Sequence, residues 1–274
     1  MTTLPTYFLS HGGGPWPYME GPFRQHYDQL EASLKAIRAD MNALGTAGPK
    51  AVLVISGHWE EADFAVSSGA QPGMEYDYYG FPDYLYHVHY RAPGSPDLAE
   101  RVQALLADAG LPARLDPQRG YDHGTFSMMQ PIWPEETMPV VQLSLNASLD
   151  PALHLAVGRL LAPLRDDGVL IIGSGLSYHN LRMMDPRAQE PSAQFDQWLQ
   201  AVLVGRSGTE RSGLLTQWDR APSARLAHPR PDHLIPLMVA VGAAEGDAGT
   251  CVYHQPDLLQ NLTASSWRFG TLAA

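Results

Sequence analysis

Short apolar runs alternate along the chain with segments whose apolar residues recur at the spacing of an amphipathic helix. The run KAVLVISGHW (50–59) is apolar and β-branched without alternation, which is typical of a strand buried on both faces. The run GVLIIGSG (168–175) has the same character and ends in glycines. The other strands that the pattern predicts are 4–10, 63–68, 86–90, 113–116, 138–146, 251–255 and 266–269.

Helical patterns lie between these runs. The clearest is SPDLAERVQALLADAG (95–110), which has a serine N-cap, a proline in the first turn and a closing glycine. The other predicted helices are one within 22–44, and 150–164, 194–204 and 232–243. No repeat, low-complexity tract or linker interrupts the alternation. The pattern therefore predicts an α/β fold: a single domain over 1–274 with a central mixed or mostly parallel sheet flanked by helices on both faces.

Composition limits the possible partners. The 274 residues carry a formal net charge of −11, so no basic stripe is present for nucleic acid or an anionic membrane. A single cysteine, Cys251, excludes a disulfide framework within the chain and a CxxC metal site. The sequence has neither the features of a signal peptide nor a long apolar run, and we expect a cytoplasmic protein.

Four of the eleven histidines fall at the ends of predicted elements. His11, His58 and His179 follow or end apolar runs, and His233 lies at the start of the predicted helix 232–243. In open α/β sheets, functional residues gather beyond the carboxyl ends of the strands, so we expect these imidazoles to converge. Nitrogen donors without a thiolate suit Fe(II) or Zn(II), and imidazole alone does not choose between them. Glu60 and Asp232 are the candidate carboxylates beside these histidines, and Glu60 belongs to the run WEEAD (59–63), which is typical of a solvated loop.

The motif HGGG (11–14) is also found in lipases and esterases, where it forms an oxyanion hole. Such an enzyme needs a serine in the frame G-x-S-x-G, and the nearest approach, GLSYH (175–179), has histidine in the last position. The sequence also lacks HExxH, a Walker A lysine and a GxGxxG after a strand. These absences argue against an esterase, the common zinc proteases, and phosphate or dinucleotide binding.

Six segments together resemble the class III extradiol ring-cleavage dioxygenases. The nearest subgroup is the DOPA 4,5-dioxygenase type, which is related to the catalytic subunit of protocatechuate 4,5-dioxygenase. The resemblance extends over almost the whole chain, in the segments FLSHGGGPW (8–16), ISGHWE (55–60), YDYYGFPDYLYHVHY (76–90), GYDHGTFSMM (120–129), IGSGLSYHNL (172–181) and HPRPDHLIPL (228–237).

The resemblance implies a metal site. His11 and His58 match the first two ligands of the family, and His233 matches the third, with His228 as the competing candidate. It implies Fe(II) in the active enzyme. A ligand set of three histidines differs from the set of two histidines and one carboxylate that is common in non-haem Fe(II) oxygenases. This difference makes Zn(II) a possible bound metal.

The resemblance also implies the roles around the metal. His179 matches the catalytic histidine that exchanges protons with the substrate, a task suited to an imidazole. A fourth metal ligand in a site without substrate is the alternative role for His179. His123 matches a histidine that lines the site and hydrogen-bonds oxygen or a substrate hydroxyl. We expect Trp16, Tyr79 and Phe81 to contact the aromatic ring of the substrate.

The implied reaction joins O2 to a small aromatic diol. Both oxygen atoms enter a catechol, DOPA-like or related, and the product is an open-chain semialdehyde acid. Arginines such as Arg119 or Arg182 could meet a substrate carboxylate. Two alternatives remain at this point: a zinc-dependent hydrolase on the same scaffold, and a non-catalytic metal-binding protein. The sequence leaves the oligomeric state open.

Overall fold

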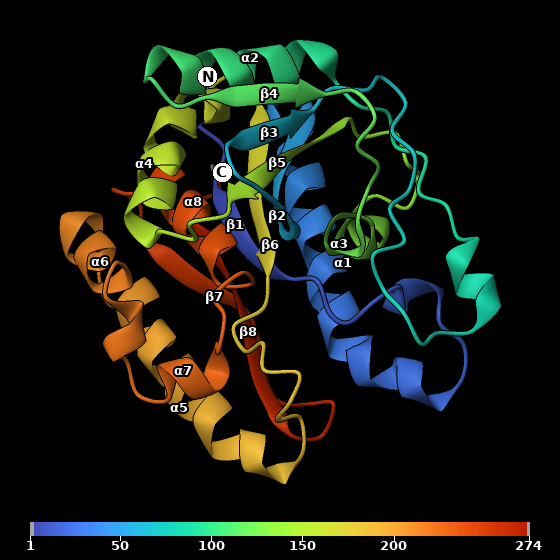
Figure 1. Ribbon diagram of the computed structural model, residues 1–274, viewed down its shortest axis with the longest axis vertical. Coiled ribbons are helices and arrows are strands. Elements are labelled where there is room, and N and C mark those ends of the chain that lie inside the picture. The colour runs from blue at the N-terminus through green and yellow to red at the C-terminus, as the bar shows by residue number, and fades with distance from the viewer. Residues whose placement is uncertain (1–2, 273–274) are drawn as a thin grey trace.

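An eight-stranded sheet runs through the middle of the computed structural model, which describes residues 3–272 (Figure 1). The strands are β1 (Thr6–Ser10), β2 (Ala51–Glu61), β3 (Phe64–Ser67), β4 (Ala113–Asp116), β5 (Val140–Asn146), β6 (Val169–Gly175), β7 (Gly249–Leu258) and β8 (Leu262–Phe269). Their order across the sheet is β4-β3-β5-β2-β6-β1-β8-β7. The four central strands β5, β2, β6 and β1 are parallel, and β8 and β7 join one side in antiparallel pairs.

Helices cover both faces of this sheet. The helices α4 and α8 pack on one face, and α1 and α3 lie on the other (Figure 1). This arrangement confirms the predicted α/β fold with a mostly parallel mixed sheet. The helices are α1 (Asp28–Ala43), α2 (Pro96–Asp108), α3 (His123–Ile132), α4 (Pro151–Leu161), α5 (Gln189–Leu203), α6 (Gly208–Leu215), α7 (Ala224–Ala227) and α8 (Ile235–Ala243).

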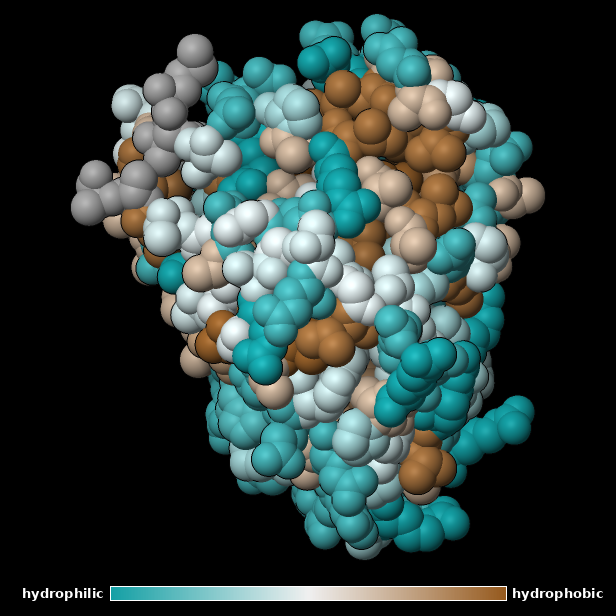
Figure 2. Space-filling model, turned by 90° about the vertical axis from the view of Figure 1, so that its left-hand side faces the viewer, coloured by the Kyte–Doolittle hydropathy of each residue, from teal (hydrophilic) through white to brown (hydrophobic). Residues whose placement is uncertain are grey.

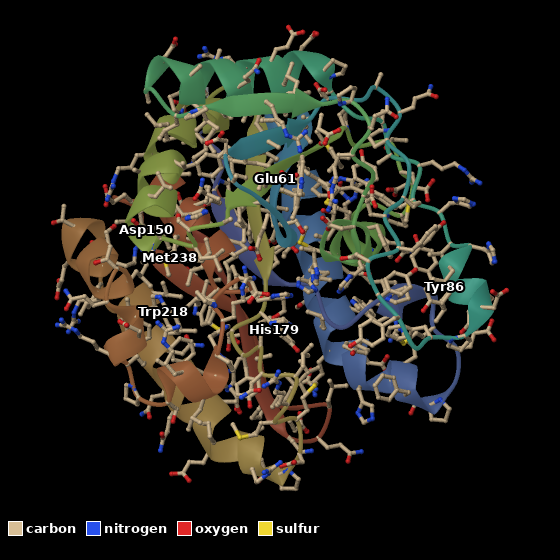
Figure 3. All side chains as sticks on the ribbon, in the orientation of Figure 1. Glu61, Tyr86, Asp150, His179, Trp218 and Met238 are labelled. Carbon is tan, nitrogen blue, oxygen red and sulfur yellow. The ribbon has the colours of Figure 1, made fainter. Side chains whose placement is uncertain are left out.

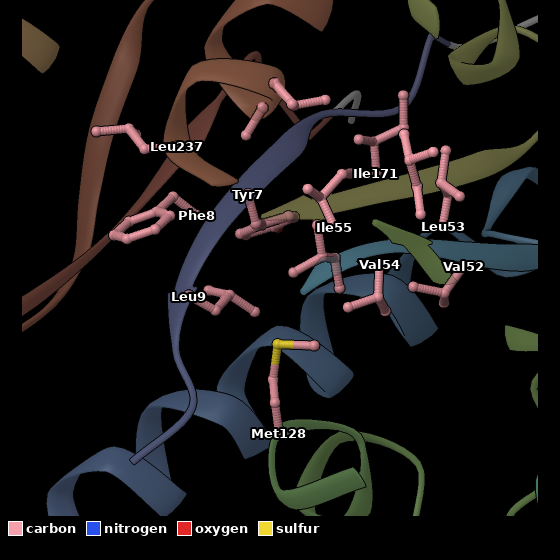
Figure 4. Packing of buried hydrophobic residues seen from close by; sticks show 14 of the residues in the cluster. Tyr7, Phe8, Leu9, Val52, Leu53, Val54, Ile55, Met128, Ile171 and Leu237 are labelled. Atoms are coloured by element: carbon pink, nitrogen blue, oxygen red, sulfur yellow. The ribbon is translucent and has the colours of Figure 1, made fainter. Parts of the chain in front are cut away.

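The core surrounds the central strands. Residues 52–55 of β2 are fully buried, as their unbroken apolar run predicts. Figure 4 shows Met128 of α3 and Leu237 of α8 on opposite sides of β1. Burying each such side chain contributes about 1.5–3 kcal/mol relative to leaving it in water. The parallel centre of the sheet is therefore held from both faces, and its strand ends form a rigid edge.

Hydrophilic residues separate the apolar areas on the face drawn in Figure 2. Among the described residues, no helix combines the length and the apolar character needed to cross a membrane.

One predicted strand, 86–90, does not form. A 3₁₀ turn, Asp83–Tyr86, is followed there by irregular chain. Tyrosine hydroxyls replace a strand partner, because Tyr76 donates to the carbonyl of Val88 (2.8 Å) and Tyr18 donates to that of His89 (3.0 Å). The prediction was wrong because side chains, not a neighbouring strand, satisfy this backbone.

Several helices differ from the sequence-based expectation, and α3, α6 and α7 lie outside every predicted helix. No sequence pattern predicts α3, since all its residues except Gln130 are buried and no polar face marks it. The helix expected from residue 232 begins instead at Ile235, with Pro236 in its first turn. As a result, His233 lies in the turn before α8, where its side chain is not part of a helical face.

Candidate active site

Five histidines meet at the carboxyl edge of the parallel strands. His11 directly follows β1, and His58 lies near the end of β2. Their ring centroids are 5.0 Å apart. Figure 3 shows His179 near the centre of the molecule, below the carboxyl end of β6. Because β2, β6 and β1 are parallel neighbours, their ends bring these residues together, as the sequence predicts.

The other two histidines come from the starts of helices. His123 begins α3, and its ring centroid is 3.9 Å from that of His58. His233 precedes α8, with its ring 4.6 Å from that of His58 and stacked on His179 at 3.4 Å. Of the histidines that the sequence singles out for the site, all except the competing candidate His228 therefore lie in one cluster.

An irregularity in β2 directs His58 into the cluster. The pairing of β2 with β5 shifts register between Ile55 and Glu60, so residues 56–59 are not in the regular ladder of these two strands, although Ser56 still pairs with Ser174 of β6. A bulge of this kind turns a side chain away from the alternation that a regular strand imposes. His58 thus lies just beyond the last regular pair of β2 with β6, beside the carboxyl ends of the neighbouring strands.

A glycine at the end of β6 lets the His233 segment approach closely. The backbone N–H of Leu176 donates to the carbonyl of His233 (3.1 Å). A Cβ at Gly175 would overlap that same carbonyl oxygen. The glycines of GVLIIGSG therefore serve close backbone packing, which places His233 beside the strand ends.

The glycines of HGGG serve the turn that follows His11. Gly12 adopts a φ of +76°, a left-handed conformation that glycine accepts at little cost. Trp16 then returns under the turn and donates its indole N–H to the carbonyl of His11 (2.7 Å). The motif holds His11 in place, and no oxyanion hole needs to be assumed.

Two carboxylates hold three of the imidazoles by their Nδ1 atoms. Asp77 lies 2.9 Å from Nδ1 of His123 and 3.2 Å from Nδ1 of His58. Asp232 lies 2.7 Å from Nδ1 of His233. A carboxylate on Nδ1 keeps the proton there and leaves the lone pair on Nε2, as is common for metal-binding histidines.

Two of these Nε2 atoms, those of His58 and His233, face each other. The Nε2 atoms of His58 and His233 are 3.0 Å apart. Two lone pairs at this distance repel, whereas two nitrogens bound to one metal ion at about 2.0–2.1 Å, near a right angle, also lie about 3 Å apart. The spacing therefore fits a shared metal ion.

His11 supplies a third nitrogen without a partner. Its side chain is buried, and neither Nδ1 nor Nε2 makes a hydrogen bond. A buried polar atom without a partner costs free energy, and a metal ion would satisfy it. The potential ligand atoms fall into two groups, each within 4.8 Å: His11, His58 and His123, and then His179, Asp232 and His233. The contact between His58 and His233 joins the two groups.

The surroundings keep four imidazoles of the cluster, those of His11, His58, His179 and His233, neutral. Burial, followed by repulsion from neighbouring histidines, lowers the pKa values of His11, His58 and His233 well below the ordinary value of 6.5. Burial also lowers the pKa of His179 to about 4. Neutral imidazoles offer lone pairs to a metal, so the cluster is ready to bind one without first losing protons.

The carboxyl groups behave differently from each other. Burial raises the pKa of Asp232 to about 6, although the nearby Arg230 opposes this. Burial also acts to raise the pKa of Asp77, but hydrogen bonds and attraction from His123 outweigh it and lower that pKa. Asp77 is therefore the more firmly ionised of the two partners of the cluster.

His228 lies apart from the cluster. It is fully buried, its Nε2 contacts the carbonyl of Ser177 (3.0 Å), and its ring packs against Phe195 and Trp218. Of the two histidines in HPRPDH, the structure brings only His233 to the strand ends.

A cavity of about 630 Å³ opens beside the histidines. Tyr79 and Phe81, two of the predicted substrate contacts, line it, and Tyr79 is 90% exposed at its mouth. Trp16 is fully buried beneath His11 and lies outside the lining. The structure therefore gives Trp16 a supporting position in place of the direct contact with substrate that the sequence suggests.

Comparisons with known proteins identify the family. Residues 5–270 match the family described as "Catalytic LigB subunit of aromatic ring-opening dioxygenase". The chain belongs to this family. It is 40% identical over 253 residues to the "4,5-DOPA dioxygenase extradiol" of Beta vulgaris, covering 91% of this chain and 90% of that protein. It is 32% identical to the protein of the same name from Escherichia coli K12, covering 89% and 87% of the two chains.

A solved structure has the same fold. The crystal structure of an uncharacterized protein from Escherichia coli K12 superposes with a TM-score of 0.74 at 30% identity, covering 97% of this chain and 99% of that one. The relatives confirm the predicted resemblance to extradiol dioxygenases and support ring cleavage of a catechol-type substrate.

The site of this ring-opening dioxygenase includes one residue that the sequence analysis did not single out. Asp77 holds both His58 and His123, although it lies in an aromatic segment, 76–86, without a regular pattern. The only sequence signal is an isolated aspartate among tyrosines. This signal does not distinguish an aspartate that hydrogen-bonds histidines from an aspartate that is exposed to solvent.

The two histidines of HPRPDH are expected to respond differently to substitution. His233→Ala should lose most of the bound metal, because its Nε2 faces that of His58. His228→Ala should keep the metal and instead lower the free energy of unfolding, because it leaves a cavity beside Phe195 and Trp218. Metal per chain and a thermal unfolding curve for each variant check this. The reverse pattern would assign the ligand role to His228.

Proposed function

We propose that the protein is an Fe(II)-dependent extradiol dioxygenase whose iron is held by His11, His58 and His233. The observation that carries this proposal is the convergence of their neutral imidazoles in the lining of the cavity, where His11 and His233 are buried and His58 is half-buried. The substrate is a catechol, DOPA-like or related, and the product is an open-chain semialdehyde acid. A bound ferrous ion would supply the electron transfer that lets O2 react with an aromatic ring.

The choice of these three ligands rests on their nitrogen atoms. His58 and His233 face each other through Nε2, and His11 lies about equally far from both, with ring centroids at 5.0 and 5.1 Å. The positions also match the ligand positions of the family resemblance. Asp77 and Asp232 orient the rings from behind, so that each keeps its lone pair toward the common centre.

His179 is the group that exchanges protons with the substrate in this proposal. It lines the cavity, and its ring is stacked on His233 while its Nδ1 lies 3.7 Å from Asp232. A catechol that approaches the ligands must therefore pass beside this imidazole. The reaction requires a substrate hydroxyl to lose a proton and a later species to regain one, and histidine serves both directions.

His123 and the aromatic segment complete the binding site. Asp77 accepts hydrogen bonds from the backbone N–H of His123 (3.0 Å) and from its Nδ1. This leaves Nε2 free to hydrogen-bond a substrate hydroxyl or oxygen. Phe81 and Tyr79 form an aromatic wall for the ring, and Trp16 holds the His11 loop in position.

Metal replacement tests the function. Protein reconstituted with Fe(II) without oxygen, then given catechol and air, is expected to consume O2 and to produce the absorbance of a ring-opened product. The matched Zn(II) sample should bind metal at the same stoichiometry without consuming O2, because zinc does not change its oxidation state. Turnover with zinc and without O2 uptake would instead support a metal-dependent hydrolase.

A further inference from the structure

The cavity continues beyond the histidines along an apolar wall. This wall is formed by the loop after β6 and by the hairpin that joins β7 to β8. We call it the apolar lobe, and its residues are Leu176, Leu181, Met184, Leu258, Leu262 and Ala264. His179 comes from the same loop, so a substituent on a ring beside His179 has the apolar lobe within reach.

The cavity is larger than a bare catechol needs. A volume of about 630 Å³ is in the range of pockets that hold drug-sized ligands, whereas a catechol is one six-membered ring with two oxygens. Phe23 and Leu181 line the cavity and are 54% and 67% exposed. Large apolar side chains exposed together at the mouth of a cavity mark a place where apolar surface binds.

Positive charge is absent from this cavity. Among the described residues that line it, none is arginine or lysine, and the two carboxylates, Asp77 and Asp232, already face histidines. Arg119, which the sequence offered for a substrate carboxylate, pairs with buried Asp122 (2.8 Å) and lies over the ring of Trp59. Arg182 is exposed and also lies outside the lining.

We propose that the catechol cleaved by this protein carries an uncharged, apolar substituent, which binds in the apolar lobe. Such a substrate is one of the related catechols and not DOPA itself, whose amino-acid side group is charged. This inference rests on the proposed function, because it names the substrate class of that same site. A carboxylate in this position would lose its hydration without gaining a cation or a charged hydrogen-bond donor. An alkyl or aryl group would gain from leaving water for the leucine and methionine side chains.

A matched pair of substrates tests the proposal. One catechol carries an isopentyl group, and the other carries a propanoate group of the same shape at the same ring position. With the iron-loaded enzyme, kcat/KM is expected to favour the isopentyl catechol by at least about tenfold, a common discrimination by a hydrophobic pocket. Binding of each catechol, measured without oxygen, should show the same preference. A preference below this, or for the propanoate, would overturn the proposal and leave the proposed function standing.

Two variants locate the substituent. Leu181→Arg places a cation in the apolar lobe, where it can pair with the carboxylate of the propanoate catechol. The variant should therefore raise kcat/KM for the propanoate catechol and lower the isopentyl-to-propanoate ratio of kcat/KM several-fold. Leu214→Arg is the matched control, since Leu214 is also exposed, at 39%, but lies in α6 outside the cavity lining. Equal effects of the two variants would show that the lobe does not hold the substituent. If neither catechol binds or is cleaved, the proposed function fails, and this inference fails with it.

Discussion

His58→Ala is expected to abolish stoichiometric metal binding while the chain remains folded. His58 lies at the centre of the cluster, with Nε2 3.0 Å from that of His233 and its ring beside those of His11 and His123. Removing it takes away one of the three proposed ligands, and two imidazoles hold a metal ion much more weakly than three. The core should tolerate the change, because His58 lies at the end of β2, beyond the buried residues 52–55.

Metal per chain after anaerobic loading and dialysis measures this effect, and circular dichroism checks the fold. The matched control is His123→Ala, which removes a neighbouring histidine of the same cluster. It should keep the metal, because His123 is assigned to the substrate and not to the ion. If His123→Ala loses the metal and His233→Ala retains it, then His11, His58 and His123 form the ligand set instead.

His179→Gln is expected to slow ring cleavage by about 10²–10⁴-fold, the range typical of a general acid–base, while iron and catechol still bind. Glutamine has a similar length and can still hydrogen-bond a substrate hydroxyl. It cannot take up and return a proton near neutral pH. The ring of His179 is stacked on that of His233 and lines the cavity, so the replacement changes the group that meets the substrate and leaves the three proposed ligands in place.

Three measurements on one sample separate the roles of His179. Iron per chain reports ligation, catechol binding without oxygen reports the ground state, and the single-turnover rate after mixing with oxygen reports the chemistry. His87→Gln is a suitable control, because its side chain is 71% exposed and lies outside the cavity lining. A metal-free His179→Gln would make His179 a ligand, and cleavage at the wild-type rate would remove it from proton transfer.

Much of the fold could be predicted because it depends on local patterns. The strand 113–116 forms with the predicted bounds, and α2 has the serine N-cap read from its sequence, with Ser95 accepting from the backbone N–H of Leu98. The segment 86–90 could not be predicted, since its tyrosine-rich composition suits a strand and only distant hydroxyl groups decide otherwise. The helix α3 left no periodic signal because all its residues except Gln130 are buried, so no exposed polar face alternates with an apolar one.

The sequence by itself determined which strand ends carry chemistry. Apolar runs specify parallel central strands, and a histidine placed at the end of such a run must lie at their common edge; this holds for His11, His58 and His179.

Tertiary structure alone decided what the sequence left open. Packing against Gly175 brought His233 to this edge, and Asp77 reached the imidazoles from a loop distant in sequence. The hairpin 249–269 contributed part of the apolar lobe to the wall of the cavity. Such contacts join residues far apart along the chain, so no local pattern encodes them, and they exist only when the whole sheet has formed.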